Sequence, residues 1–324
     1  MVERRWRHRH LLDVAGLDRS ELEMVMGLAA APPDPGAMRG RRVAILFYEA
    51  STRTRVSFEL AARDLGADVV QVSVPTSSVT KGESLVDTVR TLEALGTDVL
   101  VMRHARSGAP YLAADHVARH VVNAGDGWHA HPTQALVDLY TLRRRLPDGR
   151  LDGAKIVIVG DILHSRVARS NIWTLTTFGA DVWLCGPAAL LRGFDAWARA
   201  LAPERRLTVT TDLATALRDA DAVMALRIQR ERTGPWAAGV IDGYPARYGL
   251  TEERLELAHP RCVVLHPGPV NEGVELAPDV SRGARSAIAE QVANGVAVRR
   301  AVLQLLTSVD GHVGGDMDGH VDGH

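Results

Sequence analysis

The chain contains few cysteines and no long apolar stretch. Cys185 and Cys262 are the only cysteines among 324 residues, too few and too far apart for a disulfide framework or a cysteine-based zinc site. A reducing, cytoplasmic compartment fits this cysteine usage. Asp13 and Asp18 interrupt what would have to be the apolar part of a signal peptide, and no segment is long enough to span a bilayer, so no membrane partner is expected.

An excess of charge of either sign is also lacking. The sequence has 38 Lys and Arg against 39 Asp and Glu, a formal net charge of −1. A surface that follows a phosphate backbone needs a marked cationic excess, and the short basic segment 4–10 is better explained as a solvated N-terminus. We therefore expect no nucleic-acid partner. Lysine is rare as well: only Lys81 and Lys155 are present, so a lysine in this chain indicates a need for a compact ammonium group.

Apolar, β-rich runs alternate along the chain with helical patterns. This alternation is typical of parallel βαβ units rather than of a sandwich or a helical bundle. Strands are predicted at 43–47, 69–72, 99–102 and 121–123 and, in a second series, at 156–159, 182–185, 207–210, 222–225 and 263–265. The length of 324 residues suits two domains. We therefore expect an α/β fold of two domains, each a parallel sheet flanked by helices.

Helical patterns indicate where the two domains meet. A long helix at about 133–146, stopped by the turn sequence at 147–149, is expected to join them. Apolar stripes predict an early helix and a long C-terminal helix that packs back on the first domain. They consist of Leu22, Val25, Met26 and Ala29, and of Ile288, Val292, Val296, Leu303 and Leu306. The expected division is a first domain at 1–140 completed by a helix at 286–307, a second domain at 150–285, and a disordered Gly/Asp/His tail at 308–324.

The segment 51–55, Ser-Thr-Arg-Thr-Arg, follows a predicted strand directly and opens a helix. Its first serine is the expected N-cap, and Val56, Leu60 and Ala61 are expected to share one face of that helix. Free backbone N–H groups, three hydroxyls and a guanidinium group at a helix N-terminus would together bind a phosphate group. Taken alone, an ordinary capped helix with surface arginines explains the segment equally well.

Three further polar segments stand where ligands commonly bind. Segment 77–84 follows a strand and carries Lys81, as a loop that brings an ammonium group to an anion would, and as a solvated loop also would. Arg103 lies at the end of a predicted strand, where open parallel sheets place ligand-binding groups. His129 and His131 open the long helix, but no Cys or carboxylate cluster completes a metal site. A neutral His131 that donates to a carbonyl oxygen is the better chemistry, and neither a metal nor another cofactor is expected.

Together these segments resemble the aspartate/ornithine carbamoyltransferase family. The motifs are STRTR at 51–55, KGES at 81–84, the strand-end Arg103 and HPTQ at 131–134, in the order and spacing of that family. The resemblance extends over nearly the whole chain, from about residue 11 to residue 306, and STRTR with HPTQ is highly specific. It implies that the first domain binds carbamoyl phosphate, that the second binds the amino acid acceptor, and that a homotrimer shares its active sites between subunits.

The resemblance also implies a role for each matching residue. The residues that correspond to the carbamoyl phosphate site are Ser51, Thr52, Arg53, Thr54, Arg103, His131 and Gln134, together with Ser77 (or Ser78) and Lys81, which would reach into a neighbouring subunit's site. Those that correspond to the aspartate site are Lys81, Arg166, Arg227, Gln229, Pro267 and Gly268. Thr54, Arg103 and His131 would polarise the carbamoyl carbonyl, Lys81 would assist catalysis, and Gln134 would hold the carbamoyl amide. No motif pairs a nucleophile with a base, so acceleration would come from positioning and charge.

The second domain favours aspartate over ornithine as the acceptor. Aspartate carries two carboxylates, and Arg166 and Arg227 would supply the additional cationic contacts. The loop 160–171 matches the aspartate branch and lacks the glycines of a dinucleotide-binding turn. Ornithine enzymes carry a His-Cys-Leu-Pro segment where this chain has His-Pro-Gly-Pro at 266–269, with the Gly268–Pro269 bond expected to be cis. Val167 and Gly268 depart from common family residues, but neither departure removes a charge.

The function implied by the resemblance is an early step of pyrimidine biosynthesis, the formation of N-carbamoyl-L-aspartate and phosphate from carbamoyl phosphate and L-aspartate. One alternative is a carbamoyltransferase for ornithine or an acylated ornithine. Another is a non-catalytic scaffold member of the family, which the complete set of polar residues disfavours. The family also allows higher assembly with regulatory chains or with dihydroorotase, and the sequence does not distinguish these arrangements.

Overall fold

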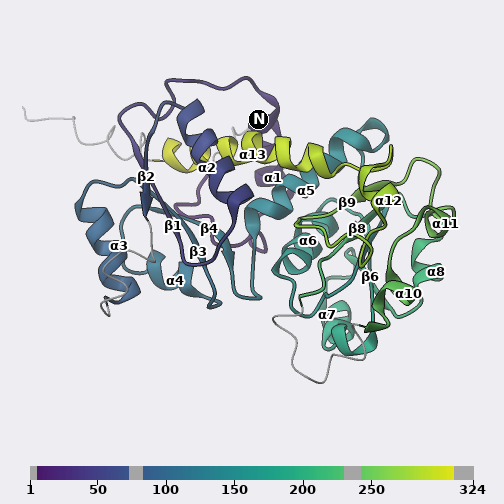
Figure 1. Cartoon of the computed structure of the whole chain (residues 1–324). Coiled ribbons are helices and arrows are strands. Elements are labelled where there is room, and N and C mark those ends of the chain that lie inside the picture. Colours follow the sequence, from purple (N-terminus) through teal and green to yellow (C-terminus); the bar gives the residue numbers. More distant parts are fainter. Residues whose placement is uncertain (1–5, 73–82, 230–241, 310–324) are drawn as a thin grey trace, which may run out of the picture. The chain divides into compact units, whose positions relative to one another are not determined.

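The protein is represented by a computed structural model that describes residues 6–72, 83–229 and 242–309. The chain divides into two compact units (Figure 1). Unit 1 contains the described residues within 1–13, 20–127 and 295–324. Unit 2 contains the described residues within 14–19 and 128–294. None of the described helices is long and apolar enough to cross a membrane.

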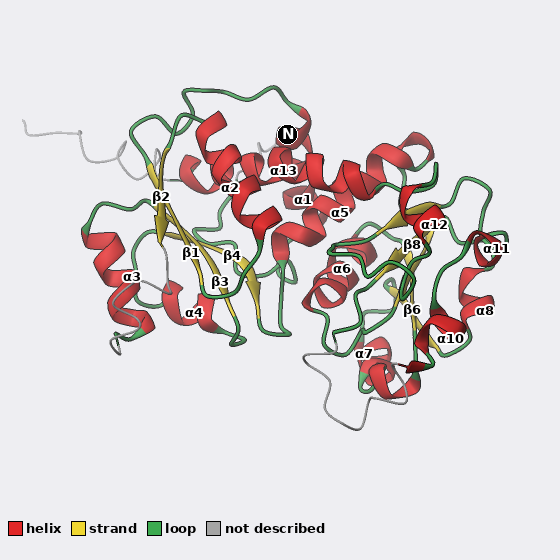
Figure 2. Ribbon diagram, in the orientation of Figure 1, coloured by secondary structure: helices red, strands yellow, loops and turns green. Residues whose placement is uncertain are grey.

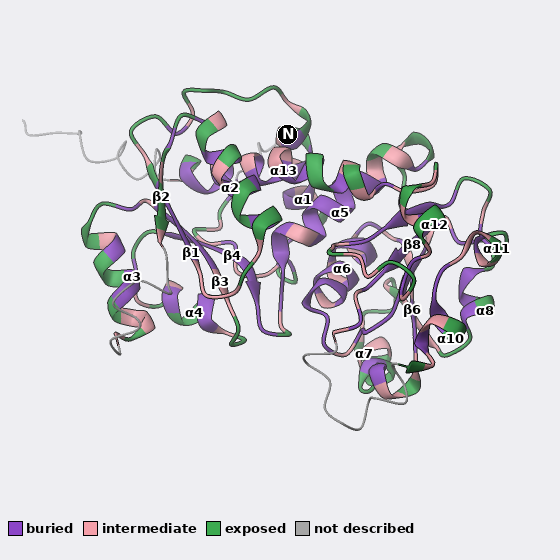
Figure 3. Ribbon diagram, in the orientation of Figure 1, coloured by how far each residue is buried: buried purple, intermediate pink, exposed green. Residues whose placement is uncertain are grey.

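Unit 1 is built on a four-stranded parallel sheet with the order β2-β1-β3-β4. Its strands are β1 (Arg42–Phe47), β2 (Asp68–Val72), β3 (Val99–His104) and β4 (His120–Asp126). Its helices are α1 (Arg19–Ala30) from Ser20 onward, α2 (Thr52–Asp64), α3 (Leu85–Ala94), α4 (Ala109–Ala114) and the part of α13 (Ile288–Ser308) that begins at Gly295. Strands β1, β3 and β4 are largely buried, whereas the edge strand β2 is largely accessible (Figure 3).

Unit 2 is built on a five-stranded parallel sheet with the order β7-β6-β5-β8-β9. Its strands are β5 (Lys155–Val159), β6 (Asp181–Cys185), β7 (Arg206–Thr210), β8 (Ala222–Ala225) and β9 (Val263–Leu265). Its helices are α5 (Pro132–Arg145), η3 (Pro147–Gly149), α6 (Arg166–Thr177), η4 (Ala188–Leu190), α7 (Phe194–Ala200), α8 (Leu213–Leu217), α10 (Tyr244–Tyr248), α11 (Glu252–Leu255), α12 (Pro278–Arg282) and the start of α13 (Figure 2). The continuous burial of β8 and β9 is expected for a parallel sheet covered on both faces.

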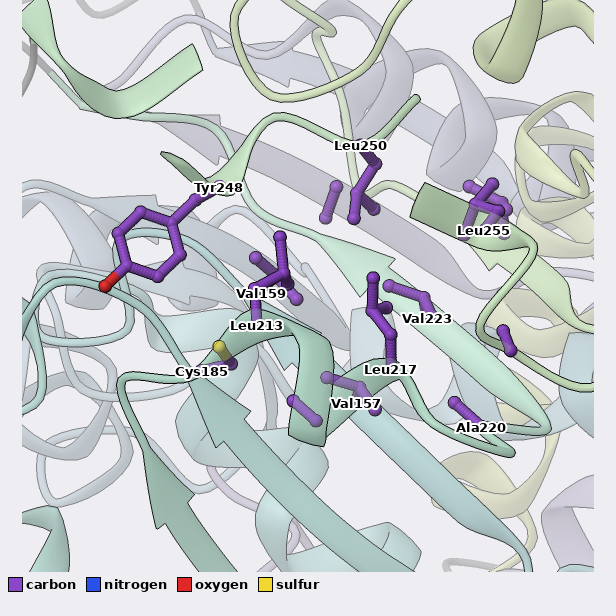
Figure 4. Packing of buried hydrophobic residues seen from close by; sticks show 14 of the residues in the cluster. Val157, Val159, Cys185, Leu213, Leu217, Ala220, Val223, Tyr248, Leu250 and Leu255 are labelled. Carbon is purple, nitrogen blue, oxygen red and sulfur yellow. The ribbon is translucent and has the colours of Figure 1, made fainter. Parts of the chain in front are cut away.

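The core of unit 2 shows how the strand sequences specify this packing. Val157 and Val159 of β5 alternate with residues that face the other side of the sheet, and they pack with Val223 of β8. Leu213 and Leu217, one turn apart on α8, cover these valines (Figure 4). Burial of a Val or Leu side chain contributes roughly 1.5–3 kcal/mol. The β-branched strands and short apolar helices therefore stabilise a rigid sheet on which loops can be carried.

All nine predicted strands are present, and the predicted fold of two parallel-sheet α/β domains is confirmed. The C-terminal helix contributes to unit 1 from Gly295 onward, as predicted. Three residues of the predicted stripes are exposed, Val56 and Leu60 of α2 at 38% and 46% and Val292 of α13 at 49%, whereas Ala61, Leu303 and Leu306 are buried. Most of the predicted tail lies outside the described residues, since α13 ends at Ser308 and the description ends at residue 309.

Candidate functional site

The predicted phosphate cradle in unit 1 is the N-terminus of α2. Ser51 is the N-cap in an extended conformation (φ −162°, ψ 91°), and its side chain makes no capping hydrogen bond. Thr54 is buried, while Thr52 and Arg53 are exposed. The first turn therefore offers backbone N–H groups and hydroxyls to an anion, with the positive end of the helix dipole behind them.

Arg103 lies at the carboxyl end of β3, beside the strand that leads into α2. In the parallel register Arg103 is the partner of Phe47, the last residue of β1. Its Nη1 donates to the Ala124 carbonyl oxygen at 3.2 Å, and its Nε lies 3.4 Å from Glu49 Oε2. Glu49 was not predicted as a site residue. Its position between the end of a strand and an arginine-rich helix start could have indicated a carboxylate that orients an arginine. These two contacts fix the direction of the guanidinium group.

Desolvation lowers the pKa of two basic side chains near the carboxyl ends of β1 and β3. It lowers the pKa of Arg53 below its usual value, although the group remains a cation at any physiological pH. Desolvation and the neighbouring Arg106 also lower the pKa of His104, whose Nδ1 accepts a hydrogen bond from the Arg106 N–H at 2.9 Å. His104 is thus favoured in its neutral form, and the permanent positive charges at this edge of the sheet come from arginine.

The second group of predicted residues lies at the start of α5 in unit 2. His131 is the N-cap, is buried, and donates its backbone N–H to Ser170 Oγ at 2.9 Å. Gln134 Nε2 donates to Asp138 Oδ1 at 2.8 Å. Among the described residues, no hydrogen bond is made to Gln134 Oε1, so this oxygen can accept a hydrogen bond from a ligand N–H.

The remaining predicted residues follow three neighbouring strands of the unit 2 sheet. Arg166 comes after β5, Arg227 and Gln229 come after β8, and the segment 266–269 comes after β9. Because β5, β8 and β9 are adjacent and parallel, these residues gather at the carboxyl edge of the sheet, where open α/β sheets bind ligands. The turns approach closely: a Cβ on Gly160, whose φ is 134°, would stand 2.7 Å from the Leu226 carbonyl oxygen, so only glycine fits.

Arg166 is the first residue of α6 and is buried. The N-cap Ser165 accepts from the Ala168 N–H through its hydroxyl at 3.1 Å, which fixes the start of the helix. The preceding turn is held by His164, whose Nδ1 lies 2.8 Å from Asp161 Oδ1, and whose carbonyl oxygen accepts from Gln229 Nε2 at 3.2 Å. The hydrogen bond from Gln229 therefore links the two loops that carry the predicted aspartate-binding residues.

The Pro267-Gly268 segment is organised by the buried side chain of His266. The Gly268 N–H donates to His266 Nδ1 at 2.8 Å, so His266 Nε2 carries the proton and donates to Glu275 Oε1 at 3.2 Å. Glu275 Oε1 also accepts from the Asn271 N–H at 2.8 Å. The Gly268–Pro269 bond is cis, as predicted. Sequence reasoning did not identify Glu275, which is separated from the motif by several residues.

The structure therefore forms two groups of the predicted residues, one in each unit. Ser51, Thr52, Arg53, Thr54 and Arg103 belong to unit 1, and His131, Gln134, Arg166, Arg227, Gln229, Pro267 and Gly268 belong to unit 2. Ser77, Ser78 and Lys81 lie outside the described residues.

Two family models together match most of the chain. The aspartate/ornithine carbamoyltransferase carbamoyl-P binding domain matches residues 9–144, and the Asp/Orn binding domain of the same enzymes matches residues 152–306. The chain belongs to the aspartate/ornithine carbamoyltransferase family.

Individual relatives lie within the aspartate branch of that family. The aspartate carbamoyltransferase catalytic subunit of Roseiflexus sp. (strain RS-1) is 51% identical over 313 residues, covering 94% of this chain and 97% of the relative. That of Heliobacterium modesticaldum is 49% identical over 317 residues, covering 94% and 98%. Aspartate transcarbamoylase from Trypanosoma cruzi, solved with carbamoyl aspartate and phosphate, is 31% identical with a TM-score of 0.84, covering 93% of this chain and 96% of that one.

Proposed function

We propose that this chain transfers the carbamoyl group of carbamoyl phosphate to the amino group of L-aspartate, an early step of pyrimidine biosynthesis. The observation that carries the proposal is the pair of arginines, Arg166 and Arg227, that follow the adjacent strands β5 and β8. Two cationic side chains at one sheet edge suit an acceptor with two carboxylates. The relatives at about 50% identity are named for aspartate, which supports the same acceptor.

In this proposal the unit 1 residues hold the phosphate group. The N–H groups and hydroxyls of the first turn of α2 bind the phosphate oxygens, and Arg53 neutralises their charge. Thr54 and Arg103 also donate to the carbamoyl carbonyl oxygen, on which negative charge develops during the reaction. Because Glu49 and the Ala124 carbonyl oxygen already orient Arg103, little reorganisation is needed at that moment.

The unit 2 residues hold the carbamoyl and acceptor groups. His131 donates to the carbamoyl oxygen, and Gln134 Oε1 accepts from the carbamoyl amide. Arg166, Arg227 and Gln229 bind the two carboxylates of aspartate, and the carbonyl oxygens of Pro267 and Gly268 accept from its amino group. The amine nitrogen attacks the carbamoyl carbon, the C–O bond to phosphate breaks, and the departing phosphate takes the amine proton. Positioning of the two reactants supplies much of the rate enhancement.

An acceptor assay tests this function. The purified full chain is given carbamoyl phosphate with aspartate, ornithine or N-acetylornithine, and both phosphate and the ureido product are measured. We expect N-carbamoyl-L-aspartate with aspartate, and turnover with either ornithine that is lower by at least about 10³-fold, because ornithine leaves a buried arginine without a carboxylate. Turnover of ornithine at or above the rate with aspartate would reject the assignment.

We further propose a homotrimer in which Lys81 and Ser77 (or Ser78) act in the site of a neighbouring subunit, in the cytoplasm. Val56 and Leu60 stand one turn apart on α2 and are both exposed, and Val70 on the edge strand β2 is 37% exposed. Neighbouring exposed apolar side chains and an accessible strand edge are typical of surfaces that another protein chain covers. The free, buried thiols of Cys185 and Cys262 are compatible with a reducing compartment.

A further inference from the structure

A buried carboxylate in unit 2 contacts Gln134, the residue to which the proposed function gives the carbamoyl amide. Asp138, on the second turn of α5, is fully buried and accepts hydrogen bonds from three side-chain amides. Gln134 Nε2 and Gln291 Nε2 donate to its Oδ1 at 2.8 and 2.7 Å, and Asn171 Nδ2 donates to its Oδ2 at 2.8 Å. A fully buried carboxylate is costly unless it is well hydrogen-bonded, so this arrangement needs an explanation beyond packing.

The amide of Gln291 extends the network to the acceptor segment. Gln291 is buried at the start of α13, and its Oε1 accepts from the His266 N–H at 2.9 Å. The chain of hydrogen bonds therefore runs from Gln134 through Asp138 and Gln291 to the backbone of His266. His266 immediately precedes the Pro267 and Gly268 carbonyls and fixes the Gly268 N–H through its ring.

The chemistry of Asp138 determines which way both glutamine amides face. Asp138 accepts from the NH₂ group of each glutamine, so each glutamine turns its amide oxygen away from this carboxylate. For Gln291 this places the oxygen on the His266 N–H. For Gln134 it leaves Oε1 available, and a flipped amide would instead present a donor to the donor NH₂ of a carbamoyl group.

We propose that Asp138 and Gln291 are positioning residues that set Gln134 and the 266–269 segment together. The inference rests on the proposed function, because that proposal gives Gln134 and the Pro267 and Gly268 carbonyls their contacts with the carbamoyl amide and the acceptor amine. One carboxylate thus orients the groups that hold both reacting partners.

A second connection between the same two helices provides a matched control. One turn further along, Asn294 Nδ2 of α13 donates to Thr141 Oγ1 of α5 at 3.0 Å, also in a buried position. Neither residue contacts Gln134 or the 266–269 segment in any described hydrogen bond. Thr141→Val removes this connection at nearly constant volume, whereas Gln291→Met and Asp138→Asn disturb the proposed positioning network.

The test compares full-length Gln291→Met, Asp138→Asn and Thr141→Val with the unmodified chain, measuring Tm, kcat and KM for both substrates. We expect all three to lower Tm. Thr141→Val should keep kcat and both KM values within about twofold. Loss of one hydrogen bond in the positioning network is worth about tenfold, so Gln291→Met should raise KM for aspartate by about that factor, and Asp138→Asn should lower kcat/KM for carbamoyl phosphate by at least as much.

The possible results separate the inference from the function on which it rests. If the unmodified chain and Thr141→Val do not carbamoylate aspartate, the proposed function fails. If both are active and Gln291→Met and Asp138→Asn are equally active despite a lower Tm, the network is only structural and the inference is overturned. If Asp138→Asn does not fold, the kinetics of Gln291→Met alone decide in the same way.

Discussion

At the scale of single residues, the two arginines of the 51–55 segment provide a sharp comparison. Arg53 and Arg55 are both exposed on the first turn of α2, two positions apart, and thus face different directions. Of these two arginines, only Arg53 binds phosphate in the proposed site. Because neither side chain is buried, replacing either one should leave the fold nearly unchanged, so a difference in activity can be ascribed to ligand binding.

We therefore predict that Arg53→Ala lowers kcat/KM for carbamoyl phosphate by at least about 100-fold, because a charge-assisted contact to a dianion is lost. Tm should change by no more than about 1–2 °C, since exposed substitutions rarely cost more than about 0.5 kcal/mol. Arg55→Ala should retain activity within a few-fold. Steady-state kinetics and thermal unfolding of the two purified variants check this prediction, and equal losses of activity in both would contradict the assigned cradle.

At the scale of secondary-structure elements, the sequence predicted the nine strands and the main helices, but not which sides of α2 and α13 are buried. On α2 the buried stripe consists of Thr54, Ser57, Phe58, Ala61 and Ala62. These residues follow the helical period, and most of them are small, which allows close packing, whereas the larger Val56 and Leu60 are exposed.

At the start of α13 one residue of the predicted stripe is exposed for a different reason. Its buried positions include Gln291 and Asn294, whereas Val292 is exposed. These polar residues are buried because their partners, Asp138 and Thr141, are supplied by α5, more than a hundred residues earlier in the chain. A hydrophobic pattern cannot predict a contact made by hydrogen bonds. For the same reason Asp138, Glu275 and Glu49 were not predicted, while the motif residues that contact substrates could be recognised.

The N-terminal segment gives an element-scale prediction about pH. Leu11 forms a parallel bridge to β4, donating to the Val121 carbonyl oxygen at 2.9 Å and accepting from the Asn123 N–H at 2.9 Å. His10 Nδ1 accepts from the Val121 N–H at 3.1 Å, which requires that this nitrogen be unprotonated. Burial, followed by the charges of Arg9 and His120, lowers the pKa of His10 from 6.5 to about 4.

His10 has its ordinary pKa when the N-terminal segment is detached from β4, and a pKa of about 4 when the segment is paired with β4. Between pH 6.5 and about 4 the detached segment therefore binds more protons than the paired one. The attachment should therefore be at full strength above pH 6.5 and weaken as the pH falls toward 4. We expect hydrogen–deuterium exchange protection of the Leu11 and Asn123 amides, corrected for intrinsic rates, to drop by about tenfold or more between pH 7 and pH 4.5. His10→Asn, whose amide oxygen can accept the same hydrogen bond without titrating, should show a much flatter profile. A slope in that variant as steep as in the unmodified chain would contradict this account.

At the scale of the whole molecule, the proposed site takes Arg53 from one subunit and Lys81 from its neighbour. Arg53→Ala and Lys81→Ala chains should each be inactive in a pure homotrimer, because every site then lacks one of the two cations. In hybrid trimers, a site is intact when its Arg53 comes from a Lys81→Ala chain and its Lys81 comes from an Arg53→Ala chain. Each trimer that contains both kinds of chain has one such site, whichever chain is present twice, so about a third of the sites in purified hybrids meet this condition.

We predict that co-expressed, differently tagged Arg53→Ala and Lys81→Ala chains, purified through both tags, recover activity on the order of a third of the unmodified value. Arg53→Ala mixed with Arg103→Ala is the control, because both residues belong to unit 1 of the same chain and no combination of these variants restores a site. Light scattering establishes that each preparation is trimeric. Verified hybrid trimers of the first pair that remain as inactive as the control pair would show that Lys81 acts within its own chain, and a fully active monomer would remove the need for a neighbour altogether.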